Sequence, residues 1–484
     1  MNEFYKLQPR RTPEPHRPFV NRERELALIK EKVDIGIRGD PMPSVVTCFW
    51  GPFGMGKSWL LGEIDRRYRF TGLREVGTQP TLVARLDLNQ EIIPVIWRDN
   101  ILNHEYLIRE LWKQLASQLN VETPDLMQMS DEQWADMFVK KVTALSSNNT
   151  ILLMLDTVDE LIRLDEPSFF WLEEKLIERL AITGRVLFIC TSRGELRIWK
   201  RFQVRQRVDS YRLRAFDSET AGKQLVASSS ISNALFQHAF GHPLVTEYLG
   251  SSLEPRTIGQ HGSYKLSETI ELSLVQDVLG KVIAEILGPL SQLETEIARI
   301  VSVLRWISVE PFRFLVEKMS LIEHGRGDVF YLDLIAALQT NHILYWNSDR
   351  KYYEFDPVLR HLLEHFLELS VPDQFSSAHL AAFQFHYDHL DRYPQYLAHY
   401  VPELAYHRSI LDQYVSINPY PATVQDWWEQ FLEKKAFGIS SEPWRELLVV
   451  LENDVELQRL SPYDYAKLVG KTRERSVSIS DLES

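Results

Sequence analysis

The chain has little cysteine, no excess of positive charge and no long apolar run. Its two cysteines, Cys48 and Cys190, both lie in apolar, strand-like segments. They are therefore predicted to be reduced core residues, which excludes a disulfide or zinc–cysteine framework. The formal net charge of −13 gives no support to bulk nucleic-acid binding. Neither a membrane span nor a secretion signal is evident, so we expect a cytoplasmic protein without a membrane partner.

The length and the ordinary composition indicate a multidomain globular protein. A chain of 484 residues is too long for a single core, and roughly three or four domains are expected. Hydrophobic residues make up 44% and charged residues 25%, which is usual for soluble proteins. We find no tandem repeat with a period near those of helical repeat proteins.

The most informative motif is GPFGMGKS at residues 51–58. It follows an apolar run at 44–50 and precedes a helical pattern, which is the strand–loop–helix context of a phosphate-binding loop. Glycines let successive backbone N–H groups point at a triphosphate, and the new helix presents its positive end. Lys57 is predicted to reach the β- and γ-phosphates, while the Ser58 hydroxyl ligates Mg²⁺. The residues predicted to bind ATP or ADP in this segment are Gly51, Pro52, Phe53, Gly54, Met55, Gly56, Lys57, Ser58 and Trp59.

An acidic strand end at residues 150–161 (TILLMLDTVDEL) supplies the second half of such a site. The pattern places Asp156 beside the metal, usually through a coordinated water. Asp159 or Glu160 is expected to polarise the attacking water, and the sequence leaves open which of them does so.

A third apolar run, at residues 185–191, ends in Thr191-Ser192-Arg193. Ligands bind at the carboxyl ends of strands in open α/β sheets. Arg193 is therefore predicted to contact the γ-phosphate and to stabilise charge in the transition state.

Several short motifs in a fixed order resemble the STAND class of signal-transduction ATPases, which includes NACHT and NB-ARC proteins. Their order is FVNREREL (19–26), GPFGMGKS (51–58), DTVDE (156–160), TSR (191–193), LRAF (213–216) and GHPL (241–244). The resemblance covers roughly residues 17–370. It implies that Phe19, Val20 and Arg22 wall the adenine and that Pro243 packs on the base. Asn21 stands where the family usually has glycine.

A winged helix follows in that family, and the residues permit one. Helical spacing occurs at 294–304, 309–319 and 330–339, a hairpin pattern at 342–355 and a further helix at 356–369. No lysine or arginine lies between Gly327 and Asp349, so a recognition helix there is a poor reader of DNA. The family often has a histidine that contacts ADP at the position of Phe355, a side chain that cannot bond a phosphate.

The expected fold is α/β: a P-loop NTPase parallel sheet with helices on both faces, then a helical lid, a winged helix and an all-α C-terminal region. The expected parts are a flexible arm at 1–16, the ATPase core at 17–212, the lid at 213–289, the winged helix at 290–370, a helical linker, sensor or partner-binding domain at 371–470, and a disordered tail at 471–484.

The sequence therefore predicts an ATPase that acts as a slow molecular switch with ATP/ADP and Mg²⁺ as cofactors. The resemblance implies nucleotide-dependent homo-oligomerisation and a protein effector supplied in trans, in defence or regulation. Two alternatives remain. One is a DNA-associated AAA+ ATPase of the origin-recognition type, although nucleic-acid binding is not expected. The other is a non-catalytic scaffold stabilised by nucleotide.

Overall fold

The computed structural model describes residues 22–69, 81–88, 104–121, 129–225, 229–253, 272–414, 424–434 and 439–478. The chain divides into two compact units, Met1–Ile270 and Glu271–Ser484. The expected N-terminal arm at 1–16, together with Phe19 and Val20, lies outside the described residues.

The first unit is built on a five-stranded sheet whose described strand pairs are all parallel. Its strand order is β2-β3-β4-β1-β5. The strands are β1 (Val46–Trp50), β2 (Thr81–Asp87), β3 (Thr150–Asp156), β4 (Val186–Ser192) and β5 (Val208–Arg212). The strand β4 follows β3 in the chain and lies between β3 and β1. Because these strands are parallel, their carboxyl ends lie side by side, and the predicted site residues occur there.

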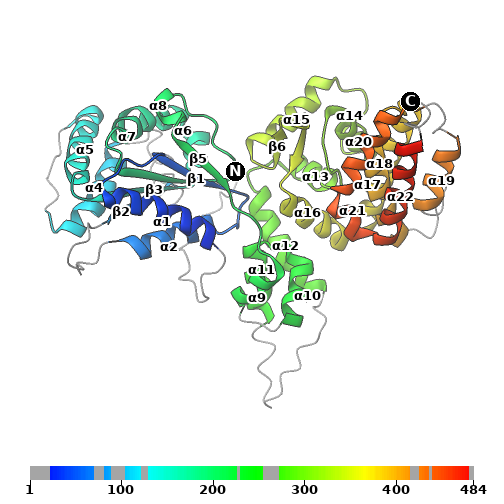
Figure 1. Ribbon diagram of the computed structural model, residues 1–484, viewed down its shortest axis with the longest axis horizontal. Helices are drawn as coiled ribbons and strands as arrows, with labels where there is room; N and C mark the ends of the chain where they lie inside the picture. The colour runs from blue at the N-terminus through cyan, green and yellow to red at the C-terminus, as the bar shows by residue number, and fades with distance from the viewer. Residues whose placement is uncertain are drawn as a thin grey trace, which may run out of the picture. The chain divides into compact units, whose positions relative to one another are not determined.

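Helices cover both faces of this sheet (Figure 1). Alternate residues of a strand point to opposite faces. Ile151 and Leu153 accordingly pack with α4 and α5 on one face, while Leu152 and Met154 pack with α1 and α2 on the other. Burial on both faces explains why the strands read as continuous apolar runs.

Two helices of the first unit begin at a capping box or a glycine. Ser130 and Gln133 form a reciprocal capping box at the start of α5, and Gly56 precedes α2. The bounds are α1 (Glu23–Arg38), α2 (Lys57–Tyr68), α4 (His104–Leu119), α5 (Asp131–Ser146), α6 (Val158–Leu172), the π-helical turn Glu173–Ile177, α7 (Glu178–Ala181), α8 (Phe202–Arg205), α9 (Ser218–Leu225), α10 (Ser229–Ala239) and α11 (Pro243–Leu253).

Both cysteines are free and buried in the sheet, as predicted. Cys48 of β1 pairs in register with Cys190 of β4. A hydrogen bond with Cys190 and burial raise the pKa of the Cys48 thiol well above its ordinary value.

The second unit begins with helices and a β-hairpin. They are α12 (Leu272–Leu287), α13 (Gln292–Val301), α14 (Val309–Lys318), α15 (Asp328–Thr340), β6 (Leu344–Asn347), β7 (Tyr352–Phe355) and α16 (Pro357–Ser370). The hairpin strands are antiparallel, and Ile307 adds an antiparallel bridge to Tyr353. Asp356 caps α16 by accepting from the backbone N–H groups of Val358 and Leu359. This is the helix–hairpin–helix order expected of a winged helix.

The rest of the second unit is helical: α17 (Pro372–Arg392), α18 (Leu397–Tyr414), α19 (Val424–Lys434), α20 (Ser441–Glu452), α21 (Val455–Leu460) and α22 (Pro462–Ser478). The prediction of disorder from residue 471 is wrong for 471–478, which continue α22. Lys471 pairs with Glu429, Arg473 pairs with Glu452, and Thr472 is buried. Tertiary contacts thus order a segment whose polar composition alone favours disorder.

The expected fold class is confirmed. The first unit has the parallel sheet with helices on both faces, and the C-terminal region is helical. The division between the compact units falls inside the expected lid at 213–289, because α12 belongs to the second unit and packs against α16 there. Among the described helices, none combines the length and apolar character needed to cross a membrane.

Candidate nucleotide-binding site

The glycine loop lies between β1 and α2. Gly54 and Gly56 have φ angles of 79° and 82°, in the left-handed region that glycine adopts without strain. A Cβ added at Gly56 would meet no atom within 4 Å, so the loop leaves open space beside the start of α2. The positive end of that helix and this open space form a cradle suited to an anion.

The Lys57 ammonium group lies along the loop. It donates hydrogen bonds to the carbonyl oxygens of Gly51 and Pro52, at 2.6 and 2.7 Å. The side chain therefore remains close to the loop that carries it, within the predicted phosphate-binding segment.

Asp156, at the end of β3, is fully buried and has a partner for each carboxylate oxygen. The Thr191 hydroxyl donates to Oδ1 at 2.5 Å, and the Arg85 guanidinium donates to Oδ2 at 2.9 Å. Arg85 also donates to the backbone oxygen of Ser58 at 3.1 Å. One guanidinium thus connects the acidic strand end to the backbone of Ser58 in the first turn of α2. The joint role of Ser58 and Asp156 at a metal stays a prediction.

The predicted base candidates and the predicted sensor form an ion-pair network. Arg193 Nη2 lies 2.8 Å from Glu160 Oε1, and Arg193 Nε lies 3.8 Å from Asp159 Oδ2. The backbone N–H of Arg193 donates to Asp159 Oδ1 at 3.2 Å. Arg163 donates from two nitrogens to Glu160 Oε2, at 2.6 and 2.8 Å. Both acids are buried, so these guanidiniums offset the cost of burying negative charge.

Arg22 binds backbone carbonyls. Its guanidinium donates to Met55 in the glycine loop at 2.8 Å and to Arg214 at 2.9 Å, and it lies over the Phe216 ring. Burial lowers its pKa from the ordinary value. Its expected place in an adenine wall stays a prediction. The contacts described here tie the N-terminal box to the loop and to the LRAF segment.

The GHPL segment reaches the loop through His242. Its Nε2 lies 2.8 Å from the carbonyl oxygen of Phe53, which accepts a hydrogen bond when Nε2 carries the proton. A Cβ at Gly54 would lie 2.4 Å from His242 Cε1, so glycine is required for this close approach. Pro243 begins α11, and its carbonyl accepts from Gln224. Its expected packing on the base remains a prediction.

A serine, a histidine and an aspartate also meet elsewhere in the first unit. His104 lies 2.7 Å from Asp131 Oδ2 and 2.9 Å from Ser168 Oγ. Ser168 is buried, and its hydroxyl donates to Asp165 at 2.5 Å. The Ser168 hydroxyl thus donates to a carboxylate and is not activated as a nucleophile by His104. The arrangement instead links helices of the first unit.

Sequence reasoning missed Arg85, Arg163, Thr191 and His242 as members of the site. Thr191 and His242 lie within motifs already recognised, so their polar side chains were a usable signal. Arg85 lies in β2, which no motif marks, and its role depends on the pairing of β2 with β3.

The sheet, the glycine loop after β1 and the acidic end of β3 together define an α/β P-loop NTPase fold. No family model and no curated protein matches the chain. Among solved structures, it is similar to the Aeropyrum pernix ORC2 protein in ADPNP–ADP complexes, at 15% identity and a TM-score of 0.44, over 74% of this chain and 96% of that one.

Two further solved structures have similar coverage. The Walker-type ATPase paby2304 of Pyrococcus abyssi is 15% identical with a TM-score of 0.47, over 71% of this chain and 96% of that one. The Aeropyrum pernix ORC1 protein in complex with DNA is 15% identical with a TM-score of 0.37, over 75% and 96%. Such likenesses leave the activity and partners of this chain undetermined.

Proposed function

We propose that this protein is an ATP-binding and slowly hydrolysing switch in which the state of the phosphate loop is passed to the helices that follow the core. The contact between His242 and the Phe53 carbonyl carries this proposal. Phe53 lies inside the predicted phosphate-binding segment, and His242 immediately precedes α11. A loop that reorganises around phosphate oxygens must change or strain this contact, which couples binding to the position of α11.

The loop residues would hold the triphosphate as the motif predicts. Gly54 and Gly56 supply the backbone curvature, and the start of α2 supplies positive potential. Lys57 would exchange its two carbonyl partners for β- and γ-phosphate oxygens, which are stronger acceptors for an ammonium group.

The donors at Ser58 and Asp156 fit a magnesium ion. Each Asp156 oxygen keeps a further lone pair beyond the one that accepts from Thr191 or Arg85. Mg²⁺ commonly retains its waters and reaches a carboxylate through one of them. Ser58 would ligate directly, and Asp156 would hold a coordinated water. A bound Mg²⁺ would neutralise developing charge on the phosphates. Arg85 would hold Ser58 and Asp156 at a fixed separation, because it donates to both.

Release of Glu160 from Arg193 is the step we propose for hydrolysis. A γ-phosphate near the end of β4 would compete with Glu160 for the Arg193 guanidinium. Glu160 Oε1 would then be available to orient water. Asp159 would stay engaged through the backbone N–H of Arg193, so we assign the water-polarising role to Glu160.

Substitutions at the loop and at the two acids test this assignment. We expect Lys57→Ala to reduce ATP affinity at least 100-fold, because a charge-assisted contact to phosphate is lost. Lys140→Ala, on exposed α5 surface, is the matched control and should bind normally. Wild-type affinity in Lys57→Ala would contradict the proposed site.

Glu160→Gln should bind ATP and lower phosphate release about 100-fold or more, because a positioned base contributes about 10²–10⁴-fold. Asp159→Asn should retain more turnover. Equal turnover in wild type and Glu160→Gln, with binding intact, would favour a non-catalytic scaffold.

A DNA-associated ATPase is the second candidate. The hairpin tip of the winged helix carries the exposed cations Arg350 and Lys351, which suit a phosphate backbone. Against this, α15 has no basic residue, carries Asp328 and Asp333, and exposes Val329 and Leu332. Duplex binding that weakens with salt and is lost in an Arg350→Glu/Lys351→Glu variant would support this candidate.

The motif order shared with STAND ATPases leads us to propose a protein effector in trans and assembly that depends on nucleotide. Light scattering after gel filtration should show a larger species with ATP and Mg²⁺ than with ADP. Glu160→Gln should make that species persist, since its triphosphate is not consumed. Identical mass in both nucleotides would count against assembly.

A further inference from the structure

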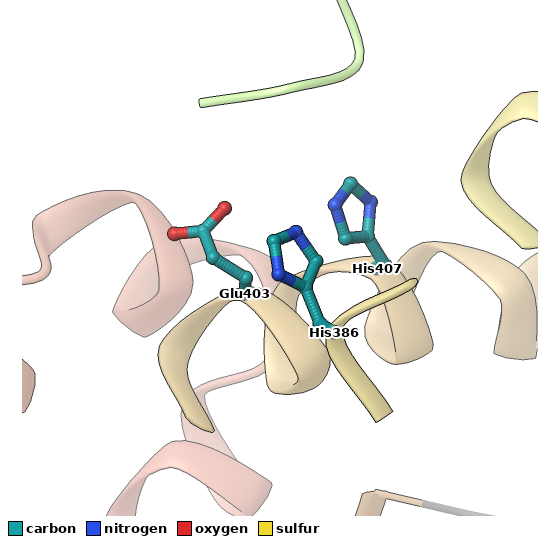
Figure 2. Close-up of side chains that lie close together, drawn as sticks. All are labelled: His386, Glu403 and His407. Atoms are coloured by element: carbon teal, nitrogen blue, oxygen red, sulfur yellow. The ribbon is translucent and has the colours of Figure 1, made fainter. Parts of the chain in front are cut away.

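A cluster of two imidazoles and one carboxylate lies in the helical part of the second unit, away from the nucleotide motifs. His386 belongs to α17, and Glu403 and His407 stand one turn apart on α18. All three are buried, and one ligand atom from each lies within 4.8 Å of the others. Figure 2 shows His386 between Glu403 and His407 in this view, with a ring nitrogen of each histidine facing the other.

Three ring nitrogens of this cluster have no hydrogen-bond partner among the residues that the structure describes. They are Nδ1 and Nε2 of His386 and Nε2 of His407. His386 is 1% exposed and His407 is fully buried. Burying a polar nitrogen without a partner costs free energy, and native proteins seldom leave one so. Each neutral imidazole has one N–H and one lone pair, so each ring of the cluster offers one nitrogen lone pair that a metal ion can accept.

The Nδ1 side of His407 faces a second buried histidine. Its Nδ1 lies 2.9 Å from Nδ1 of His379, and Nε2 of His379 lies 3.3 Å from Oε1 of Glu364. If His407 donates through Nδ1, its Nε2 keeps a lone pair that faces the cluster. Metal-bound histidines commonly donate their other N–H to a group that leads to a carboxylate.

The charge around the cluster also favours a cation. Arg305 pairs with Glu403 and Asp454, and Arg360 pairs with Glu364 and Glu456. Two guanidiniums therefore face four carboxylates. His361 lies 3.8 Å from both Glu364 and Glu456, and the carboxylates of this group outnumber its guanidiniums by two. A divalent cation would balance that excess.

We propose that His386, Glu403 and His407 bind a divalent transition-metal ion of the zinc class and thereby fasten α17 to α18. Two imidazoles and a carboxylate are donors that Zn²⁺ accepts, with a fourth position left for another ligand. Tetrahedral bonds of about 2.1 Å set ligand atoms about 3.4 Å apart, so small side-chain rotations close the separation seen here.

The contact of Glu403 with Arg305 is compatible with this site. Arg305 Nη2 lies 2.8 Å from Oε1, and Nε lies 3.1 and 3.2 Å from the two oxygens. A carboxylate offers about four lone-pair positions, so it accepts from a guanidinium and still ligates a metal. Glu403 is a poor position for a test, however, because its removal leaves Arg305 without one of its two ion-pair partners, the other being Asp454.

The test uses the full chain, stripped with chelator and titrated with Co²⁺ and then Zn²⁺. We expect one Co²⁺ per chain with visible d–d absorption, displacement of Co²⁺ by Zn²⁺, and a rise in the midpoint of thermal unfolding with Zn²⁺. His386→Gln and His407→Gln should each weaken Co²⁺ binding at least 100-fold, and His379→Gln should weaken it about 10–100-fold as a supporting residue.

His365→Gln, which removes a histidine of α16 that pairs with Glu368, is the matched control and should bind as wild type. His361→Gln separates this site from the neighbouring group of His361, Glu364 and Glu456. The proposal is overturned if Co²⁺ and Zn²⁺ leave the spectrum and the melting midpoint unchanged. It is equally overturned if binding persists in a His386→Gln/His407→Gln variant whose circular dichroism matches wild type.

Discussion

Among single residues, Arg85 links two parts of the candidate site, although it lies in β2, a strand that no motif marks. Its guanidinium joins Asp156 to the Ser58 carbonyl, and Gly62 of α2 leaves room for it, since a Cβ there would lie 3.3 Å from Arg85 Nη1. A buried acid without such a partner is costly. Arg85 therefore offsets the cost of burying the Asp156 carboxylate at the end of β3.

Removal of Arg85 should destabilise the protein through the charge that it leaves behind. We expect Arg85→Ala to lower the free energy of unfolding by about 3–5 kcal/mol, the usual cost of breaking a buried pair from one side. Adding Asp156→Asn should recover part of that loss, because no unpaired charge then remains. Urea unfolding of both single variants and the double variant measures the coupling. Strict additivity would contradict this account, and Arg179→Ala, from an exposed pair with Asp136, should change little.

At this scale the sequence predicted the residues that motifs mark. Lys57, Asp156 and Arg193 follow from spacing alone, and their roles toward nucleotide and metal stay predictions. In the structure Lys57 contacts the Gly51 carbonyl, Asp156 accepts from Thr191, and Arg193 pairs with Glu160. The position of Arg85 required knowledge that β2 lies beside β3, which is a long-range pairing. Local sequence carries no signal for it.

Among the elements, the winged-helix region was predicted closely. The expected helix at 309–319 is α14 (Val309–Lys318), and the expected hairpin at 342–355 contains β6 and β7. Strong apolar periodicity and an Asn-Ser-Asp turn made these helices and this hairpin predictable from the sequence. β2 and β5 were not predicted, because their short runs include Arg85 or alternate with polar residues and lack a flanking motif.

The turn before α11 depends on Gly241. Its φ is 75°, and an added Cβ would lie 2.0 Å from the Phe216 carbonyl oxygen. We expect Gly241→Ala to cost about 2–5 kcal/mol, the sum of left-handed strain and a backbone clash. Gly56→Ala is the control, since its φ is 82° and its Cβ would meet nothing within 4 Å. Urea unfolding without nucleotide should show the larger loss for Gly241→Ala, and equal losses would refute the clash.

The pair of α14 and α15 predicts a specific pH dependence. Tyr331 donates to Glu317 at 2.6 Å. This hydrogen bond is the largest cause of the lowered pKa of Glu317, while burial and the same bond raise the pKa of Tyr331 to about 12. The stability from Glu317 is present above its ordinary pKa and lost as pH falls. The stability from Tyr331 is present below pH about 10 and lost as pH rises toward 12.

Tyr331→Phe should therefore cost about 1.5–3 kcal/mol near pH 7, the usual value of a hydrogen bond to a charged group. Its difference from wild type should shrink in acid and above pH about 10. Tyr465→Phe, whose hydroxyl donates to the Leu451 carbonyl, should show no loss of effect in acid. Chemical unfolding across pH gives the comparison, and a pH-independent cost for Tyr331→Phe would contradict the assignment.

For the whole molecule, two compact units imply two separable responses to ligands. The first unit has its core on the two faces of the sheet, and the second has buried side chains of its own. A ligand stabilises only the unit that binds it, by about 2.7 kcal/mol at 100 times its dissociation constant. That corresponds to about 5–10 °C for units of this size.

Differential scanning calorimetry should accordingly resolve two transitions. ADP with Mg²⁺ should raise one of them, Zn²⁺ should raise the other, and Lys57→Ala should remove only the first effect. A single transition that both ligands shift equally would show that the units unfold together.

The sequence did not predict where the chain divides. Residues 213–289 form one lid in the expected organisation, while α12 packs in the second unit. Both sides of the boundary are helical and amphipathic, so composition and periodicity do not distinguish them. The packing partner of an amphipathic helix is a property of the folded chain.

The two arginines on Glu160 differ in their access to solvent. The Arg163 side chain is 43% exposed, whereas that of Arg193 is 20% exposed. In the proposed cycle, Glu160 has to leave Arg193. We expect its pair with Arg163 to influence the rate of that step, and so the lifetime of the bound triphosphate. A partly exposed pair is worth at most about 1 kcal/mol, or roughly a fivefold change in rate. A partner protein whose acidic side chain binds Arg163 would change the hydrolysis rate from the surface, without contacting the nucleotide.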